Sequence, residues 1–249
     1  MKIVYDIGMY DASDTEYFLE CGYDVLAVEA NPVLAKQALE RLDSHVQTGR
    51  LRVINAAVAD SEGHVDLNVC GDDLGSSSIV PGKISGRPSA GKYVVPTISV
   101  QSLFQAYGVP FYLKIDIEGA DALFVRSLTR STRPELLSFE TDDNLEEVLA
   151  HVASIGFTKF KLINQLNFLE LSNQSCLRER LARKLIRMLG YSEPQYVKRA
   201  GRWFKCYHSS GPGPWCSDGK WDTLQKTLDA WRRAKSNNQL RGWYDVHAA

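Results

Sequence analysis

Short apolar runs alternate with amphipathic segments along the first two thirds of the chain. Residues 4–7 form an apolar run that ends beside a glycine, and residues 25–28 form a second run that ends in an acid. Between them, residues 13–22 place apolar side chains at helical spacing and stop at a glycine. Asn31 and Pro32 are suited to cap and begin the next helix. This order predicts an opening strand–helix–strand unit of the kind found in nucleotide-binding sheets.

The same alternation continues as far as residue 163. A continuous apolar run at 51–58 is typical of a buried parallel strand, and 157–163 has the period of a more exposed, antiparallel edge strand. We therefore predict an α/β fold, a doubly wound Rossmann-like sheet of seven mostly parallel strands with helices on both faces. The other expected strands are 64–69, 93–99, 111–117 and 135–140, and the later helices are 100–107, 119–128 and 145–155.

Residues 71–91 are rich in glycine, serine and aspartate, which predicts a loop near the ligand edge of the sheet. After residue 164 the composition changes, and we interpret 165–249 as an insertion or cap packed on a core formed by 1–164. Within it, 176–189 is a basic amphipathic helix. Its basic face is explained by solvation, by an anionic glycan or acceptor, or by peripheral contact with an anionic membrane. Residues 242–247 form a polar and aromatic tail.

Charge and cysteine content exclude some function classes. The net charge is -1 over 249 residues, which argues against a nucleic-acid partner because neutralising phosphates needs a basic excess. No apolar run is long enough to span a bilayer, and no basic and apolar leader precedes the first strand, so we expect a cytoplasmic protein. The five cysteines are scattered, and no compact spacing of ligands predicts a metal site.

The turn after the first strand indicates which ligand the sheet binds. A dinucleotide site uses Gly-x-Gly-x-x-Gly beside a pyrophosphate, whereas residues 6–12 contain one glycine and two acids. Carboxylates beside a diphosphate are costly, but they suit the sulfonium and ammonium groups of S-adenosylmethionine. Glu29, at the end of the second strand, can accept hydrogen bonds from both ribose hydroxyls. The plainer interpretation is that Asp6 caps a turn and Glu29 is a solvated strand end.

The chain carries four short motifs, at residues 6–8, 28–32, 56–63 and 113–121. Together these motifs resemble those of the FkbM-type methyltransferases, which are S-adenosylmethionine-dependent enzymes on a Rossmann-like sheet. The resemblance implies that Asp6 and Gly8 line the methionine end of the cofactor, that Glu29 holds the ribose, and that 55–60 flanks the adenine. It also implies that Asp116 lies near the transferable methyl group. The motifs are Asp6-Ile7-Gly8, Val28-Glu29-Ala30-Asn31-Pro32, 56–63, and Leu113-Lys114-Ile115-Asp116-Ile117-Glu118-Gly119-Ala120-Asp121. The full set of expected cofactor residues is Asp6, Gly8, Tyr10, Glu29, Ala30, Asn31, Ala57, Asp60 and Asp116.

The first motif departs from the family pattern. Family members usually carry Asn two residues after the glycine of Asp-x-Gly and Gly two residues further on, where this chain has Tyr10 and Ala12. A bulkier turn is expected to reshape the cofactor pocket. This departure keeps open a non-catalytic module that binds S-adenosylmethionine without turnover.

Acids at strand ends are the candidates for catalysis. Asp116 and Glu118 follow a central strand, where open α/β sheets bind their ligands, and we expect them to accept a proton or position the acceptor. The alternative is that Asp116 binds the cofactor ammonium and Glu118 caps the next helix. Glu140 and Asp142 leave the following strand at the same rim and are candidates for substrate contact.

Other polar side chains are weaker candidates for substrate contact. Ser77 and Ser78 lie in the expected loop and could donate hydrogen bonds, and His247 lies among aromatic residues that suit a sugar. The function that these residues favour is O-methyl transfer from S-adenosylmethionine to a hydroxyl, on a sugar of a glycan or a glycosylated metabolite. An NAD-dependent oxidoreductase is the alternative enzyme class, since Glu29 could serve either ribose.

Overall fold

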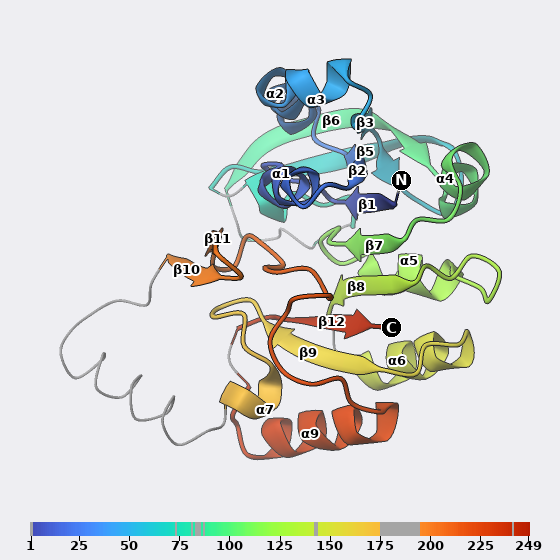
Figure 1. Cartoon of the computed structure of the whole chain (residues 1–249). Helices are drawn as coiled ribbons and strands as arrows, with labels where there is room; N and C mark the ends of the chain where they lie inside the picture. Colours follow the sequence, from blue (N-terminus) through green and yellow to red (C-terminus); the bar gives the residue numbers. More distant parts are fainter. Residues whose placement is uncertain are drawn as a thin grey trace. The chain divides into compact units, whose positions relative to one another are not determined.

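The structure is a computed structural model that divides into two compact units, residues 1–142 and 143–249 (Figure 1). The sequence analysis placed this division at residue 164. It falls earlier because the helix and strand that follow residue 143 belong to the second unit. The residues that the structure describes are 2–72, 74–80, 82, 86, 88–141, 144–174, 195–240 and 242–249.

The first unit contains five parallel strands in the order β3-β2-β1-β7-β8. Most of their side chains are apolar, and those of β1, β2 and β7 are largely buried, as expected for strands covered by helices on each side. Val4, Tyr5 and Ile7 of β1 are fully buried, and so is Leu113 of β7. The bounds are β1 Ile3–Ile7, β2 Asp24–Glu29, β3 Leu51–Asn55, β7 Tyr112–Ile115 and β8 Leu136–Glu140.

Side chains at the expected positions begin the helices of this unit. The Asn31 side chain accepts a hydrogen bond from Val33 N, and Pro32 occupies the first turn of α2. Ser99 accepts from Ser102 N in the same way at the start of α4. The helices are α1 Ser13–Glu20, α2 Pro32–Arg41, α3 Asp43–Gln47, α4 Val100–Tyr107 and α5 Asp121–Ser127.

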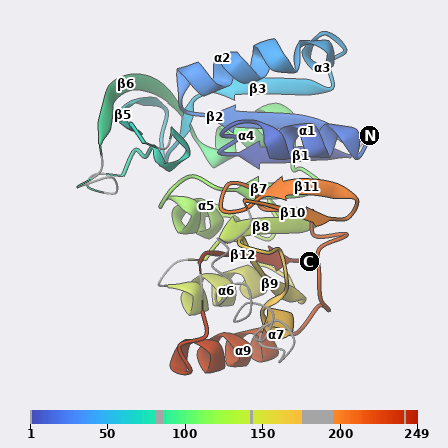
Figure 2. The same ribbon diagram turned by 90° about the vertical axis from the view of Figure 1, so that its left-hand side faces the viewer.

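A small second sheet, of order β4-β6-β5, stands beside the parallel strands (Figure 2). It comprises β4 Ala57–Val58, β5 Gly63–Cys70 and β6 Ser89–Ile98. A short 3-10 helix, η1 Leu74–Ser76, lies between β5 and β6 in the sequence. β6 begins within the segment that was expected to be loop up to residue 91, because it pairs with β5 along its full length. Ala57, Leu67, Val69 and Val95 form its buried core.

The second unit is built on an antiparallel pair, β9 Phe160–Asn164 and β12 Tyr244–Ala248. All five residues of β12 are buried, whereas Gly242 and Trp243 before it are exposed. The polar and aromatic tail predicted at 242–247 is therefore a buried strand from residue 244 onward. The pairing of β9 confirms the antiparallel strand expected at 157–163. The strand begins at residue 160 and all five of its residues are buried, so it is not the more exposed strand that the alternation predicted. The remaining elements are α6 Leu145–Ser154, α7 Leu171–Gln174, β10 Tyr196–Arg199, β11 Arg202–Lys205 and α9 Leu224–Ser236.

Five strands in the first unit and two in the second agree with the predicted Rossmann-like α/β fold of seven mostly parallel strands. The basic helix predicted at 176–189 lies outside the described residues. Among the helices that the structure describes, none is both long and apolar enough to cross a membrane.

Candidate functional site

A pocket lies at the carboxyl ends of β1, β2 and β7, where open α/β sheets bind ligands. Its empty space is about 580 Å³, a figure that includes open solvent at its mouth. All of its lining residues belong to the first unit. Nine of the residues expected from the sequence line it, namely Gly8, Tyr10, Glu29, Ala30, Ala57, Ser77, Ser78, Asp116 and Glu118.

Gly8 is required where β1 ends because the chain there passes directly against the end of β7. Its φ is 84°, and a Cβ atom at this position would lie 1.7 Å from the carbonyl oxygen of Asp116. The Gly8 N–H also donates to the carbonyl of Val28 at 2.9 Å, which ties the turn to β2. A side chain at residue 8 would therefore push apart the two strand ends that form the floor of the pocket.

The departure from the family pattern leaves the backbone of the turn strained. Tyr10 and Ala12 have φ values of 50° and 59°, in the left-handed region that favours Asn and Gly. The backbone thus adopts the conformation that suits the usual family residues, although the side chains differ. Such strain costs about 1–2 kcal/mol for each residue, and strain of this kind is concentrated at functional sites.

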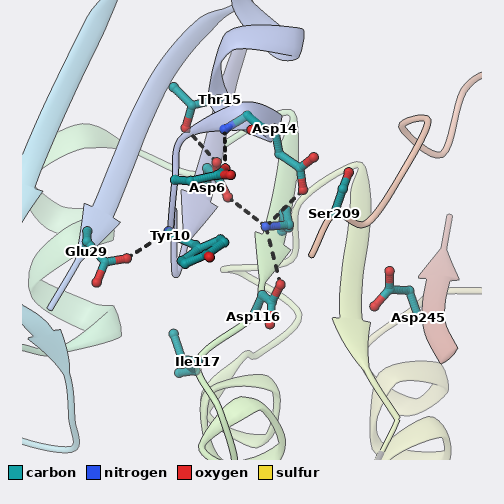
Figure 3. Close-up of polar contacts among 12 residues, drawn as sticks. Asp6, Tyr10, Asp14, Thr15, Glu29, Asp116, Ile117, Ser209 and Asp245 are labelled. Atoms are coloured by element: carbon teal, nitrogen blue, oxygen red, sulfur yellow. Dashed lines mark hydrogen bonds and ion pairs between the residues drawn. The ribbon is translucent and has the colours of Figure 1, made fainter. Parts of the chain in front are cut away.

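Glu29, the last residue of β2, is fixed by the backbone on either side of it. Its Oε2 accepts a hydrogen bond from Tyr10 N at 2.8 Å, and its Oε1 accepts one from Asn31 N at 2.7 Å (Figure 3). Burial raises the pKa of Glu29 to about 7, although both N–H groups lower it. Each carboxylate oxygen can accept further hydrogen bonds. The side chain is therefore a pre-oriented acceptor at the wall of the pocket.

A buried ammonium group joins the acids beneath the pocket. Lys114 Nζ lies 3.1 Å from Asp6 Oδ1, 3.3 Å from Asp14 Oδ2 and 3.6 Å from Asp116 Oδ2 (Figure 3). Burial alone would lower the pKa of Lys114, but these carboxylates outweigh it and hold the pKa well above its usual value. Thr15 Oγ1 also donates to Asp6 Oδ2 at 2.6 Å.

Asp6 therefore does not reach the pocket, contrary to the expected contact with the cofactor. It is fully buried, and burial raises its pKa even though Lys114 and Thr15 lower it. Asp116 is the member of the group that faces the pocket, with 29% of its side chain exposed. Asp6 acts on the site through Lys114, which links it to Asp116. The sequence analysis did not single out Lys114.

The turn after β7 is held by its own hydrogen bonds. Asp121 accepts from the N–H groups of Ile117 and Gly119, each at 3.3 Å, and its burial raises its pKa to about 6. Glu118 has a φ of 45°, and its carbonyl oxygen accepts from Ser78 Oγ at 2.8 Å. This contact joins the turn to the segment that follows β5, so the wall of the pocket is closed on that side.

The two serines expected to donate to a ligand use their protons within the protein. Ser78 donates to Glu118 as described, and Ser77 Oγ donates to the carbonyl of Leu74 at 2.7 Å. Ser78 also exchanges two backbone hydrogen bonds of 3.0 Å with Asn68 of β5. Both serines therefore shape the pocket wall in this structure and correct the expectation of free donors.

Apolar side chains form the rest of the pocket wall, and sequence reasoning missed most of them. Leu34 comes from α2 and Val58 from β4, whereas Leu67, Leu74 and Ile79 come from β5 and the segment after it. The alternation of apolar and polar residues at 64–69 could have identified one of them, because it places Leu67 on the buried face of the strand. These residues give the pocket an apolar side opposite its carboxylates.

Three other expected residues, Asn31, Asp60 and Glu140, do not line the pocket. Asn31 caps α2 and supports Glu29 through its N–H. Asp60 follows β4 and does not line the pocket, and neither does Glu140, which is half-buried at the end of β8. Asp142 lies outside the described residues. The substrate roles of Glu140 and Asp142 stay predictions.

His247 is part of a buried polar network in the second unit. Its Nδ1 lies 3.1 Å from Ser217 Oγ, and Lys161 Nζ donates to the same oxygen at 3.2 Å. Burial, followed by the charge of Lys161, lowers the pKa of His247 to about 3. The imidazole is fully buried, so it does not offer the exposed sugar contact that the sequence suggested. Among the described residues, no group of three or more His, Cys, Asp or Glu side chains could hold a metal ion.

Comparison with solved structures finds methyltransferases among the chains similar to this one, at low identity. An FkbM methyltransferase from Methylobacillus flagellatus matches with 14% identity and a TM-score of 0.47, over 66% of this chain and 40% of that protein. This chain thus spans less than half the length of that protein. A SAM-dependent methyltransferase from Thiobacillus denitrificans, in complex with S-adenosylhomocysteine, matches with 11% identity and a TM-score of 0.35, over 100% and 84% of the two chains.

Comparison of the chain with protein-family models and with curated proteins identifies its family. No curated protein matches the chain. The family model described as the methyltransferase FkbM domain matches residues 6–166, which include every residue of the pocket. The matched segment is well over half of the 249 residues. The chain belongs to the FkbM methyltransferase family.

Proposed function

We propose that the protein is an S-adenosylmethionine-dependent O-methyltransferase that acts on a hydroxyl of a sugar, in a glycan or a glycosylated metabolite. Family membership supports the transfer class, and the sugar hydroxyl is the acceptor that we infer from the family resemblance. The observation that carries the proposal is that the carboxylates of Glu29 and Asp116 line the same pocket as a set of apolar side chains, among them Val58, Leu67 and Ile79.

The residues of the pocket fit the three parts of this cofactor. The apolar side, including Val58, Leu67 and Ile79, suits the adenine ring, and the carboxylate of Glu29 suits the ribose hydroxyls. Asp116 suits the cationic end, because its partly exposed carboxylate faces the pocket while Lys114 holds it from below. The close approach at Gly8 keeps this end free of side chains. When bound, S-adenosylmethionine supplies a methyl group made electrophilic by the sulfonium.

The acids at the mouth of the pocket are suited to handle the acceptor proton. A hydroxyl that becomes a methyl ether must lose its proton, and a positioned carboxylate that takes it contributes about 10²–10⁴-fold. Glu118 lines the pocket, and its backbone is fixed by Ser78, so it is our candidate for this base. Asp116 aligns the cationic end, and alignment of this kind supplies several kcal/mol, up to about 7–11 in well-oriented cases.

The alternative functions have less support. An NAD-dependent oxidoreductase would place a diphosphate close to the carboxylate of Asp116, a repulsive arrangement, and family membership argues against it. A non-catalytic module that binds the cofactor would explain the unusual Tyr10 and Ala12. Against it, the backbone of this turn has the left-handed conformation that suits the usual family residues.

Calorimetric titration with S-adenosylmethionine, S-adenosylhomocysteine and NAD separates these functions when it is paired with a mass-spectrometric screen for methylated sugars. We expect binding of the first two ligands only, and a gain of one methyl group on a sugar acceptor. Glu118→Gln should lower kcat about 10²-fold or more and leave cofactor affinity within about twofold. Asp66→Asn, on an exposed position of β5, is the matched control. Binding of NAD alone would contradict the proposal, and tight cofactor binding without any turnover would favour the module.

A further inference from the structure

The hairpin of β10 and β11 presents two different faces (Figure 1). Tyr196 is paired with Lys205 and Lys198 with Trp203, and directly opposed residues in antiparallel strands share a face. These four residues form one face, which we name the aromatic–lysine face. Ala200 and Gly201 close the hairpin with φ values of 45° and 84°, the two positive values that a tight two-residue turn requires.

The opposite face anchors the hairpin to the second unit. Phe204 is buried, and its ring lies 5.6 Å from that of Phe168, which is fully buried. Cys206 N donates to the carbonyl of Gln195 at 2.9 Å and closes the open end of the hairpin. The hairpin is therefore a fixed ribbon with one packed side, and its other side faces outward.

The aromatic–lysine face exposes large rings where an antiparallel ribbon ordinarily has polar side chains. Trp203 is 62% exposed and Tyr196 is 51% exposed. Neither Lys198 nor Lys205 forms an ion pair with another residue that the structure describes. Residues 195–206 contain two further arginines and no acid. On the aromatic–lysine face, rings and lysines thus alternate along each strand and across the ribbon.

We propose that the aromatic–lysine face binds the headgroup region of an anionic phospholipid membrane. Trp and Tyr rings concentrate at this depth of a bilayer, since one end of each ring is apolar and the other can form hydrogen bonds. Lysines on the same face attract anionic headgroups. A single-stranded nucleic acid would also stack its bases on such rings, but the net charge of -1 argues against a nucleic-acid partner. The chain as a whole carries a net charge of -1, so long-range repulsion from the membrane is small.

Cosedimentation of the full chain with vesicles tests this proposal directly. We expect binding to vesicles that contain phosphatidylserine and little binding to phosphatidylcholine alone, with a strong dependence on salt. The double variant Lys198→Gln/Lys205→Gln should weaken binding about tenfold or more. The double variant Lys226→Gln/Lys235→Gln removes the same charge from exposed positions of α9 and should change binding less than about twofold.

A second experiment measures whether the ring of Trp203 contacts the lipid. Brominated lipid should quench part of the tryptophan fluorescence of the bound protein, and Trp203→Phe should remove that part, whereas Trp243→Phe, another half-exposed tryptophan of the second unit, should not. Three results would overturn the proposal: equal binding to neutral and anionic vesicles, unchanged binding of both hairpin variants, or binding to heparin or single-stranded DNA without binding to vesicles. Far-UV circular dichroism of each variant establishes that it is folded.

Discussion

Both units bury ionisable side chains, but they bury them for different purposes. In the first unit, Glu29 and Asp121 are held by backbone N–H groups at strand ends that open into a pocket. In the second unit, His247 and Lys161 both contact the hydroxyl of Ser217 in the interior of the unit. Neither residue lines the pocket. Buried charge near a pocket indicates ligand binding, whereas the same burial inside a packed strand pair fixes structure.

The difference predicts opposite responses to pH. Raised pKa values of about 7 for Glu29 and about 6 for Asp121 mean that the folded first unit holds more protons than the unfolded chain. Their contribution to the free energy of unfolding is present below pH 4 and is lost as pH rises to 7. The lowered pKa of about 3 for His247 has the opposite effect. Its contribution is present above pH 6.5 and is lost as pH falls toward 3.

The largest effect should come from a side chain at residue 8. Gly8→Ala places a Cβ atom 1.7 Å from the Asp116 carbonyl and should cost about 4 kcal/mol or more of unfolding free energy, or abolish folding. Gly22→Ala is the matched control, because Gly22 has a similar φ of 90° with no atom within 4 Å of the added Cβ. It should cost only about 1 kcal/mol. Urea unfolding compares the two, and equal losses would show that backbone strain alone explains the need for Gly8.

The next effect should come from Lys114, which compensates the acids below the pocket. Lys114→Met leaves Asp6, Asp14 and Asp116 without their cation and should cost about 3–5 kcal/mol at pH 8. The loss should be smaller at lower pH, because burial raises the pKa of Asp6 and this carboxyl can then take up a proton. Lys36→Met, at an exposed pair with Glu40, should cost less than about 0.5 kcal/mol. A loss for Lys114→Met that does not depend on pH would point to lost packing instead of lost charge.

An effect of intermediate size concerns the second unit alone. Lowering the pH from 7 to 4 should reduce the free energy of opening of β12 by about 3 kcal/mol, because the buried His247 must take up a proton. Amide hydrogen exchange measures this, with the amides of β1 as an internal reference that should not show the same loss. His247→Gln should flatten the dependence. Equal acid sensitivity in both units would remove the distinction between them.

The smallest effect concerns strain beside the pocket. Ala12→Gly should raise the free energy of unfolding by about 1 kcal/mol, because glycine adopts the φ of 59° without the steric cost. Ala38→Gly, in the right-handed helix α2, should instead lower it by about 1 kcal/mol. Thermal unfolding distinguishes the two signs, and a loss at residue 12 would show that the turn is not strained.

Local patterns predicted most of the first unit. The acid at the end of β2, the cap at Asn31 and the glycine after β1 were all visible because each depends on neighbours in sequence. Lys114 was missed because its importance depends on register. Only the pairing of β1 with β7 places Lys114 opposite Asp6. Its position between Leu113 and Ile115 in an apolar strand was a usable signal.

The sequence was least informative where long-range pairing decides burial. Asp245 and His247 interrupt the apolar pattern, so their segment was interpreted as a polar tail. Pairing with β9 makes it a buried strand instead, with Ser217 as the partner of the imidazole. The sequence also showed no sign of the left-handed backbone conformation at Tyr10, because neither a tyrosine nor the residues beside it favour a positive φ.

The central claim is that Glu29 holds the ribose of an adenosyl ligand, and calorimetric titration with adenosine tests it most directly. Adenosine lacks the titratable groups of methionine, so its pH dependence reports the protein. Because the free carboxyl has a pKa of about 7, affinity should rise about tenfold between pH 6 and pH 8 as the carboxylate forms. Glu29→Gln should abolish this rise and weaken binding at pH 8 about tenfold or more. An unchanged dissociation constant in Glu29→Gln would contradict the claim.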